Sequence, residues 1–112
     1  MTAANYNLTI DQGSDFAIDL VVKDDSVVKN LTGYSARAQM RNTKGAAAIA
    51  ATFTCTIPSA TAGEVKMELP NATSSAISAG KYYYDLELYT SSDAIVSRLM
   101  QGTVIITPEV TR

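Results

Sequence analysis

The chain has 112 residues, and its eleven acidic and nine basic side chains give a formal net charge of −2. This length suits one domain with one hydrophobic core, so we expect residues 1–112 to form a single domain with short N- and C-terminal arms. The basic residues form no cluster, which argues against nucleic acid as a partner. The longest apolar run, residues 46–51, is far shorter than the roughly 20 residues of a membrane-spanning helix, so we expect no membrane partner.

Two residue counts limit the chemistry further. Histidine is absent, which removes the usual general base near neutral pH and the commonest metal ligand. Cys55 is the single cysteine and cannot form a disulfide within the chain. The N-terminus lacks the pattern of a secretion signal, so we expect synthesis in a cytoplasm. The sequence predicts neither a metal nor another cofactor.

The first third of the chain reads as short strands separated by turns. Residues 6–10 alternate and end at a turn over residues 11–14. Residues 24–26 predict a hairpin turn with a brief return at residues 27–28, and Gly33 in the loop 30–34 is suited to a positive φ. The clearest strand is residues 15–23, whose inward side is predicted to carry Phe16, Ile18, Leu20 and Val22.

The middle of the chain predicts three more strands. In residues 35–41 the polar side chains Arg37, Gln39 and Arg41 recur at every second position, which indicates a solvated face rather than a binding groove. Residues 46–51 are ambiguous between a short helix and a loose strand, and we favour a loop that leads into a strand over residues 52–57, ended by Pro58. A turn then leads to residues 64–69 as the other half of a hairpin. The inward side chains are predicted to be Ala36, Ala38, Met40, Phe53, Cys55, Ile57, Val65, Met67 and Leu69.

The most informative segment is residues 77–89, which follows a predicted helical turn at residues 73–77. Gly80 precedes Tyr82 by two residues at a strand entrance. Immunoglobulin-like sandwiches use such a tyrosine corner, in which the phenol hydrogen-bonds to upstream backbone. The strand is predicted to direct Tyr82, Tyr84, Leu86 and Leu88 inward.

Residues 95–100 return after a turn, Gly102 is placed where a bulge would bend the strand, and residues 103–107 end at Pro108. The pattern totals about seven or eight short strands with turns every 8 to 12 residues and at most one helical turn. It predicts an all-β, antiparallel, immunoglobulin-like β-sandwich.

Candidate catalytic groups are weak. Asp85 and Glu87 lie about 7 Å apart on one strand face, a spacing that overlaps that of inverting glycosidases, yet such carboxylates usually only solubilise a strand. Ser78 and Lys81 have the spacing of a serine–lysine pair but lie at a corner rather than at a helix start. Cys55 reads as a small buried hydrophobe. We therefore predict no catalytic residue and no enzyme.

A calcium site remains an alternative at two places. Asp11 with Asp15, or Asp24 with Asp25, could supply carboxylate oxygens. The same residue types are also what tight turns prefer, and a calcium loop normally offers three or more oxygen side chains.

Interaction residues are predicted on two kinds of segment. Tyr83 and Tyr89 face away from the inferred core, where tyrosine is a good interface anchor, although cross-strand packing explains them equally well. Edge strands and terminal arms can add to a neighbour's sheet. From residues 6–10 and 103–112 we select Tyr6, Leu8, Ile10, Val104, Ile106 and Val110.

Six blocks together resemble small immunoglobulin-like virion proteins of tailed bacteriophages, a group that includes the N-terminal domain of the phage upper baseplate protein and short cyanophage structural proteins. The blocks are residues 8–16 (LTIDQGSDF), 30–34 (NLTGY), 36–41 (ARAQMR), 63–65 (GEV), 79–86 (AGKYYYDL) and 101–104 (QGTV).

The resemblance implies a non-enzymatic virion component, an adaptor, decoration or cement module that docks onto capsid, neck, tail or baseplate proteins. It implies many copies in a symmetric assembly and a location in the virion. Because the chain ends at Arg112 without a further domain, a free-standing module is favoured over a carrier of a receptor binder. A soluble carbohydrate- or ligand-binding β-sandwich that uses the exposed tyrosines is the alternative.

Overall fold

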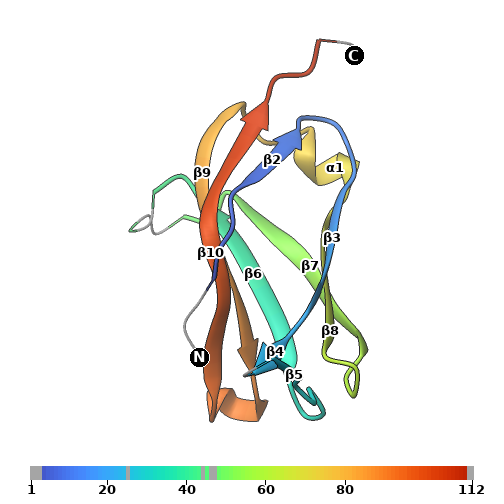
Figure 1. The fold of residues 1–112 in the computed structure, drawn as a ribbon. Coiled ribbons are helices and arrows are strands. Elements are labelled where there is room, and N and C mark those ends of the chain that lie inside the picture. Colours follow the sequence, from blue (N-terminus) through green and yellow to red (C-terminus); the bar gives the residue numbers. More distant parts are fainter. Residues whose placement is uncertain (1–3, 25, 44, 46–47, 111–112) are drawn as a thin grey trace.

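The computed structural model describes residues 4–24, 26–43, 45 and 48–110, which form a mostly-β protein with one short helix (Figure 1). The helix α1 is Asn71–Ser74, and a 3-10 turn covers Ser91–Asp93. No helix in this described part is long and apolar enough to cross a membrane. The strands are β1 (Ala4–Asn5), β2 (Leu8–Asp11), β3 (Phe16–Val21), β4 (Lys23–Asp24), β5 (Val27–Val28), β6 (Ser35–Arg41), β7 (Ala51–Ser59), β8 (Glu64–Leu69), β9 (Gly80–Tyr89) and β10 (Val96–Thr107).

The large sheet is a single, strongly curled half-barrel. Its strand order is β1-β10-β9-β6-β7-β8-β3, with β2 also paired to β10, while β4 and β5 form a separate hairpin. The curl occurs at β7, because residues 51–53 pair with β6 and residues 54–59 pair with β8. Figure 1 shows β7 crossing diagonally from β6 to β8. A strand that changes partners in this way turns one part of a sheet over the other.

The sheet is mixed, so the prediction of a wholly antiparallel arrangement is wrong. β1 and β2 both pair with β10 in parallel, with Leu8 opposite Val104 and Ile10 opposite Ile106. The remaining pairs are antiparallel. Hydrophobic alternation predicts which side of a strand faces the core, but it contains no information on the direction of the neighbouring strand.

The predicted alternation is confirmed in β6, β7, β8 and β9, and the inward side chains meet inside the half-barrel. Phe16, Ile18 and Leu20 of β3 also face inward, but they are only partly buried because β3 ends the sheet. The buried hydrophobic core consists of Leu8, Ile10, Val22, Leu31, Ala38, Met40, Ala51, Phe53, Val65, Met67, Leu69, Ile77, Tyr84, Leu86, Leu88, Leu99, Met100, Val104 and Ile106.

The connections follow the predictions with small shifts. The β4–β5 hairpin is present, although Asp25 lies outside the described residues, and Gly33 has a φ of 88°. The helical turn begins at Asn71 rather than at residue 73. Residues 48–50 form a loop that leads into β7, as predicted, whereas residues 46 and 47 lie outside the described part.

Two predicted strand irregularities are misplaced. Pro58 does not end β7, which continues to Ser59; the register with β8 shifts between Thr56 and Ser59, where a proline without an N–H group is tolerated. The bulge in β10 lies between Arg98 and Met100. Gly102 instead remains in register, opposite Tyr84.

The predicted tyrosine corner is present. The Tyr82 hydroxyl donates a hydrogen bond of 2.7 Å to the Ser78 carbonyl oxygen, four residues upstream. Tyr84, two residues further along β9, is buried, and its hydroxyl donates to the Tyr6 carbonyl oxygen. Burial raises the pKa of Tyr84 to about 12, which keeps this donor protonated. The first tyrosine closes a local loop, and the second holds the N-terminal segment against the sheet.

We predict that Tyr84→Phe destabilises the protein more than Tyr82→Phe. The Tyr84 bond is part-buried whereas the Tyr82 bond is exposed to water, which competes for it. We expect a loss of about 1 kcal/mol for Tyr84→Phe and less for Tyr82→Phe. Urea denaturation measures both, with Tyr89→Phe as the control because its ring contact with Arg37 is retained. Equal losses for Tyr82→Phe and Tyr84→Phe would contradict this ranking.

Gly102 allows the N-terminal segment to approach β10 closely. A Cβ atom at this position would overlap the Tyr6 carbonyl group and would lie 2.9 Å from Asn7 Oδ1. The Tyr6 N–H group donates to the Gln101 carbonyl oxygen over 2.9 Å, and the Thr103 N–H group donates to Asn7 Oδ1 over 3.1 Å. The backbone of β10 and the segment between β1 and β2 therefore touch directly.

We predict that Gly102→Ala displaces the N-terminal segment, because the overlapping atoms of Tyr6 are backbone and cannot rotate away. The expected loss of stability is about 2 kcal/mol. Hydrogen exchange should accelerate at the Tyr6 and Thr103 amides, whose partners shift. Gly45→Ala is the matched control, since a Cβ there meets nothing within 4 Å. Unchanged hydrogen-exchange rates at both amides would show that Gly102 and the Tyr6 carbonyl group are not in close contact.

Candidate functional site

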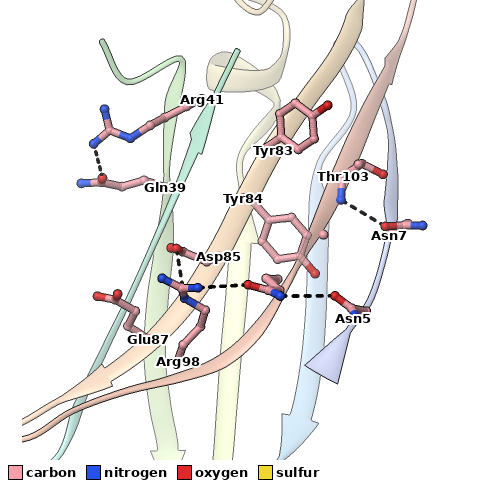
Figure 2. A pocket seen from close by; sticks show the side chains of 12 residues that line it. Asn5, Asn7, Gln39, Arg41, Tyr83, Tyr84, Asp85, Glu87, Arg98 and Thr103 are labelled. Carbon is pink, nitrogen blue, oxygen red and sulfur yellow. Dashed lines mark hydrogen bonds and ion pairs between the residues drawn. The ribbon is translucent and has the colours of Figure 1, made fainter. Parts of the chain in front are cut away.

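An open hollow of about 630 Å³ lies on the outer face of the sheet, away from the core. Its floor is formed by β6, β9 and β10, and the N-terminal segment forms one wall (Figure 2). Most of the lining is polar. The lining residues are Asn5, Asn7, Gln39, Arg41, Tyr83, Tyr84, Asp85, Glu87, Arg98, Gln101, Gly102 and Thr103.

Strand register brings these side chains together. In β9 the inward positions are apolar, so Tyr83, Asp85 and Glu87 are left on the outer face. Asp85 lies opposite Gln39 of β6 on one side and opposite Gln101 of β10 on the other. Residues from three distant parts of the chain thus meet at one level of the sheet.

A row of one ion pair and two hydrogen bonds crosses the hollow from β9 to β1 (Figure 2). Arg98 Nε lies 3.5 Å from Asp85 Oδ2, and Arg98 Nη1 donates to Gln101 Oε1 over 3.1 Å. Gln101 Nε2 in turn donates to Asn5 Oδ1 over 3.4 Å. The row alternates acceptors and donors and fixes the orientation of the two amides.

The other walls of the hollow are also held in place. Asn7 uses its Oδ1 atom to accept from the Thr103 amide, while Arg41 Nη2 donates to Gln39 Oε1 over 3.0 Å. The Lys81 ammonium lies 5.6 Å from the centre of the Tyr83 ring. Figure 2 shows Tyr83 at one end of the hollow and Arg98 pointing towards Asp85.

A second charged cluster lies beside the hollow. Arg37 Nε is 2.9 Å from Glu87 Oε1, and Arg37 Nη1 is 3.3 Å from Asp93 Oδ1. The hydrogen bond with Glu87 is the main cause of the raised pKa of Arg37. The same guanidinium lies 4.4 Å from the centre of the Tyr89 ring, so Arg37 covers this predicted interaction residue.

The eight predicted interaction residues fall into three groups. Leu8, Ile10, Val104 and Ile106 are buried in the core, where β2 pairs with β10, so their side chains do not reach the surface. Tyr83 and Tyr89 are half-buried on the outer face, as predicted. Tyr6 and Val110 have 50% and 92% of their surface exposed.

Sequence reasoning missed several outer residues. Gln39 and Arg41 line the hollow, although the spacing of polar residues in β6 was interpreted as a solvated face. In β10 the selected residues were Val104 and Ile106, whereas Ile105 between them is exposed. The alternation of β10 could have identified Ile105. Asn5, Asn7 and Gln101 give no such signal, because their proximity depends on the parallel pairing of β1 with β10.

The carboxylates considered for a calcium site and the Cys55 thiol were located in the structure where it describes them. Asp11 Oδ1 accepts from the Thr107 hydroxyl, and Asp15 Oδ1 accepts from the Asn71 backbone N–H group. In the part of the chain that the structure describes, no three His, Cys, Asp or Glu residues gather as a metal site would require. The side chains of Asp24 and Asp25 lie outside that part. Burial raises the pKa of the inward, half-buried Cys55 to about 11, so its thiol is protonated at neutral pH.

Comparison with models of known protein families found no match to this chain, and comparison with curated proteins also found none. The resemblance to phage virion proteins therefore rests on the sequence blocks alone.

We predict that the free energy of unfolding of Asp85→Asn increases relative to that of wild type as the pH rises. Burial, followed by repulsion from Glu87, raises the pKa of Asp85, and the attraction of Arg98 only partly opposes this shift. The folded state therefore keeps a proton that the unfolded chain loses, and wild-type stability falls as the pH rises through the raised pKa.

Urea denaturation at pH 3 and at pH 7 tests this linkage. Relative to wild type, Asp85→Asn should gain stability between the two pH values, because asparagine has no proton to lose. Asp19→Asn, on the exposed outer side of β3, is the matched control. A variant that loses relative stability at pH 7 would show that the Arg98 ion pair outweighs burial.

Proposed function

We propose that this chain is a non-enzymatic structural protein of a tailed-bacteriophage particle, an adaptor, decoration or cement module that docks onto capsid, neck, tail or baseplate proteins. The observation that carries the proposal is that three of the blocks that resemble phage virion proteins make specific contacts in this fold. Gly80 and Tyr82 form the tyrosine corner, and Gly102 receives the N-terminal segment. Gln12 joins two loops.

Gln12 links segments that are far apart in the sequence. Its Nε2 atom donates to the Ile77 carbonyl oxygen over 2.7 Å, and its Oε1 atom accepts from the Glu109 N–H group over 3.0 Å. The block around Gln12 thus fixes both the loop before β9 and the segment after β10. Contacts of this kind give a physical reason for these residue types at these positions.

The strand pairing also supports an immunoglobulin-like sandwich as the finer description. One layer contains β2, β10, β9 and β6, in which each strand pairs with the next. The other layer contains β3 and β8, and β7 contributes to both layers. A sandwich of this type packs two layers over one core and carries a tyrosine corner at the entrance to a late strand. Tyr82 occupies that position at the start of β9.

Docking in this proposal uses side chains rather than terminal arms. β10 is paired on both sides, with β9 on one and with β1 and β2 on the other, so its backbone groups are not available to a neighbouring sheet. Exposed apolar side chains of these segments are Tyr6, Ile105 and Val110. Such side chains surrounded by polar residues are typical anchors of protein interfaces. In a symmetric particle, many weak contacts of this kind add up.

The proposal excludes an enzymatic role and a nucleic-acid partner. Asp85 and Glu87, which have the spacing of a glycosidase pair, are held by Arg98 and Arg37 on an open sheet face. Four basic residues of the described part lie beside carboxylates or aromatic rings, namely Lys29, Arg37, Lys81 and Arg98. This arrangement is that of a surface whose charges are paired within the molecule.

Phage particles purified from cells that carry the gene for this chain test the proposal. We expect the wild-type chain in many copies per particle by quantitative mass spectrometry and on the particle surface by immunogold labelling. Ile105→Asp should reduce incorporation about tenfold, because a charge would be buried at the contact.

Val21→Asp is the matched control, since Val21 is an exposed aliphatic residue on β3, at the other end of the sheet order. Both variants must remain folded by circular dichroism. Particles that lack the chain would overturn the proposed function. Equal incorporation of Ile105→Asp and wild type would overturn the docking surface alone.

A further inference from the structure

The polar hollow has the dimensions of a ligand site. Its volume of about 630 Å³ lies within the range of small-ligand sites. Long polar side chains of the lining and the N-terminal segment surround its floor (Figure 2). The floor is rigid, because β9 is hydrogen-bonded to β6 on one side and to β10 on the other.

The lining offers donors and acceptors in alternation. The row consists of Asp85, Arg98, Gln101 and Asn5. Apart from the Arg98 guanidinium, the contacts within it use Asp85 Oδ2, both side-chain polar atoms of Gln101, and Asn5 Oδ1. Asp85 Oδ1 and the Asn5 NH₂ group make no contact in that row. An alternating set of this kind matches a molecule whose own groups both donate and accept, and hydroxyl groups do both.

The charges of the hollow select against ions. Two guanidinium groups, Arg41 and Arg98, and two carboxylates, Asp85 and Glu87, line it, so their formal charges cancel. Arg98 is already paired with Asp85, and an incoming phosphate would meet both carboxylates. A metal cation or an ammonium group would meet the guanidinium groups instead. An uncharged ligand avoids both penalties.

The backbone argues against an extended peptide. Peptides that add to sheets bind through backbone groups at an edge, or they place apolar side chains in pockets. Here the backbone of β9 is paired on both sides, and the hollow offers mainly polar side-chain tips.

We propose that this hollow binds an uncharged, hydroxyl-rich ligand, a short neutral oligosaccharide, through Asn5, Asn7, Asp85 and Gln101. The carboxylate of Asp85 accepts from sugar hydroxyls, and the amides of Asn5 and Gln101 bind neighbouring hydroxyls along the row. Charge-assisted bonds to a carboxylate are the strongest available contacts there, so Asp85 contributes most to affinity. Ile105, the docking residue tested above, does not line the hollow.

Nuclear magnetic resonance titration of the full ¹⁵N-labelled chain tests the site. The probes are maltotriose, cellotriose, chitotriose and mannotriose, each added to about 20 mM, because open polar sites bind with millimolar dissociation constants. At least one sugar should shift the side-chain NH₂ signals of Asn5, Asn7 and Gln101 in a saturable manner. Inorganic phosphate, added at the same concentration, should not shift them.

Asp85→Asn should weaken the binding of that sugar at least tenfold, whereas the same change at Asp19 should leave it unaltered. Asp19 lies on the exposed outer side of β3 and does not line this hollow. Both variants must keep the wild-type amide spectrum away from the substituted residue.

Three results would overturn the inference. In the first, none of the four sugars shifts the three NH₂ signals. In the second, sugar shifts cluster elsewhere on the surface or persist unchanged in Asp85→Asn. In the third, phosphate binds at the hollow and the sugars do not, which would identify it as an anion site.

Discussion

The contact between the Tyr6 carbonyl group and Gly102 determines how the N-terminal segment joins the sheet. It requires a residue without a side chain in β10, and the hydroxyl of Tyr84 reinforces it from β9. With the segment held at this point, the parallel pairing of β2 with β10 follows, and Leu8 and Ile10 enter the core. The N-terminal segment thereby covers hydrophobic side chains inside the half-barrel at this end of the sheet.

The same contact places functional groups. Asn5 and Asn7 flank Tyr6, so the approach that buries Leu8 also brings two amides to the rim of the polar hollow. On the floor, alternation in β9 separates a buried apolar side from an outer side with Tyr83, Asp85 and Glu87. Core and candidate site are therefore two faces of the same strands, and a change in register would alter both.

Much of the fold could be predicted from the sequence because period-two alternation reports burial directly. The inward side of β9 and the tyrosine corner at Tyr82 were predicted and are confirmed. The direction of β2, the continuation of β7 through Pro58 and the position of the bulge in β10 were not predicted. Each of these depends on which strands are neighbours, and alternation within one strand does not contain that information.

The sequence by itself determined a mostly-β chain, the inward sides of its strands and the tyrosine corner, because local patterns of apolar and turn residues are sufficient for these features. Only the tertiary structure decided that the terminal strands pair with each other, which buries Val104 and Ile106 and leaves Ile105 exposed. It alone brought Asn5, Asp85 and Gln101 together, since their meeting depends on strand register between distant parts of the chain.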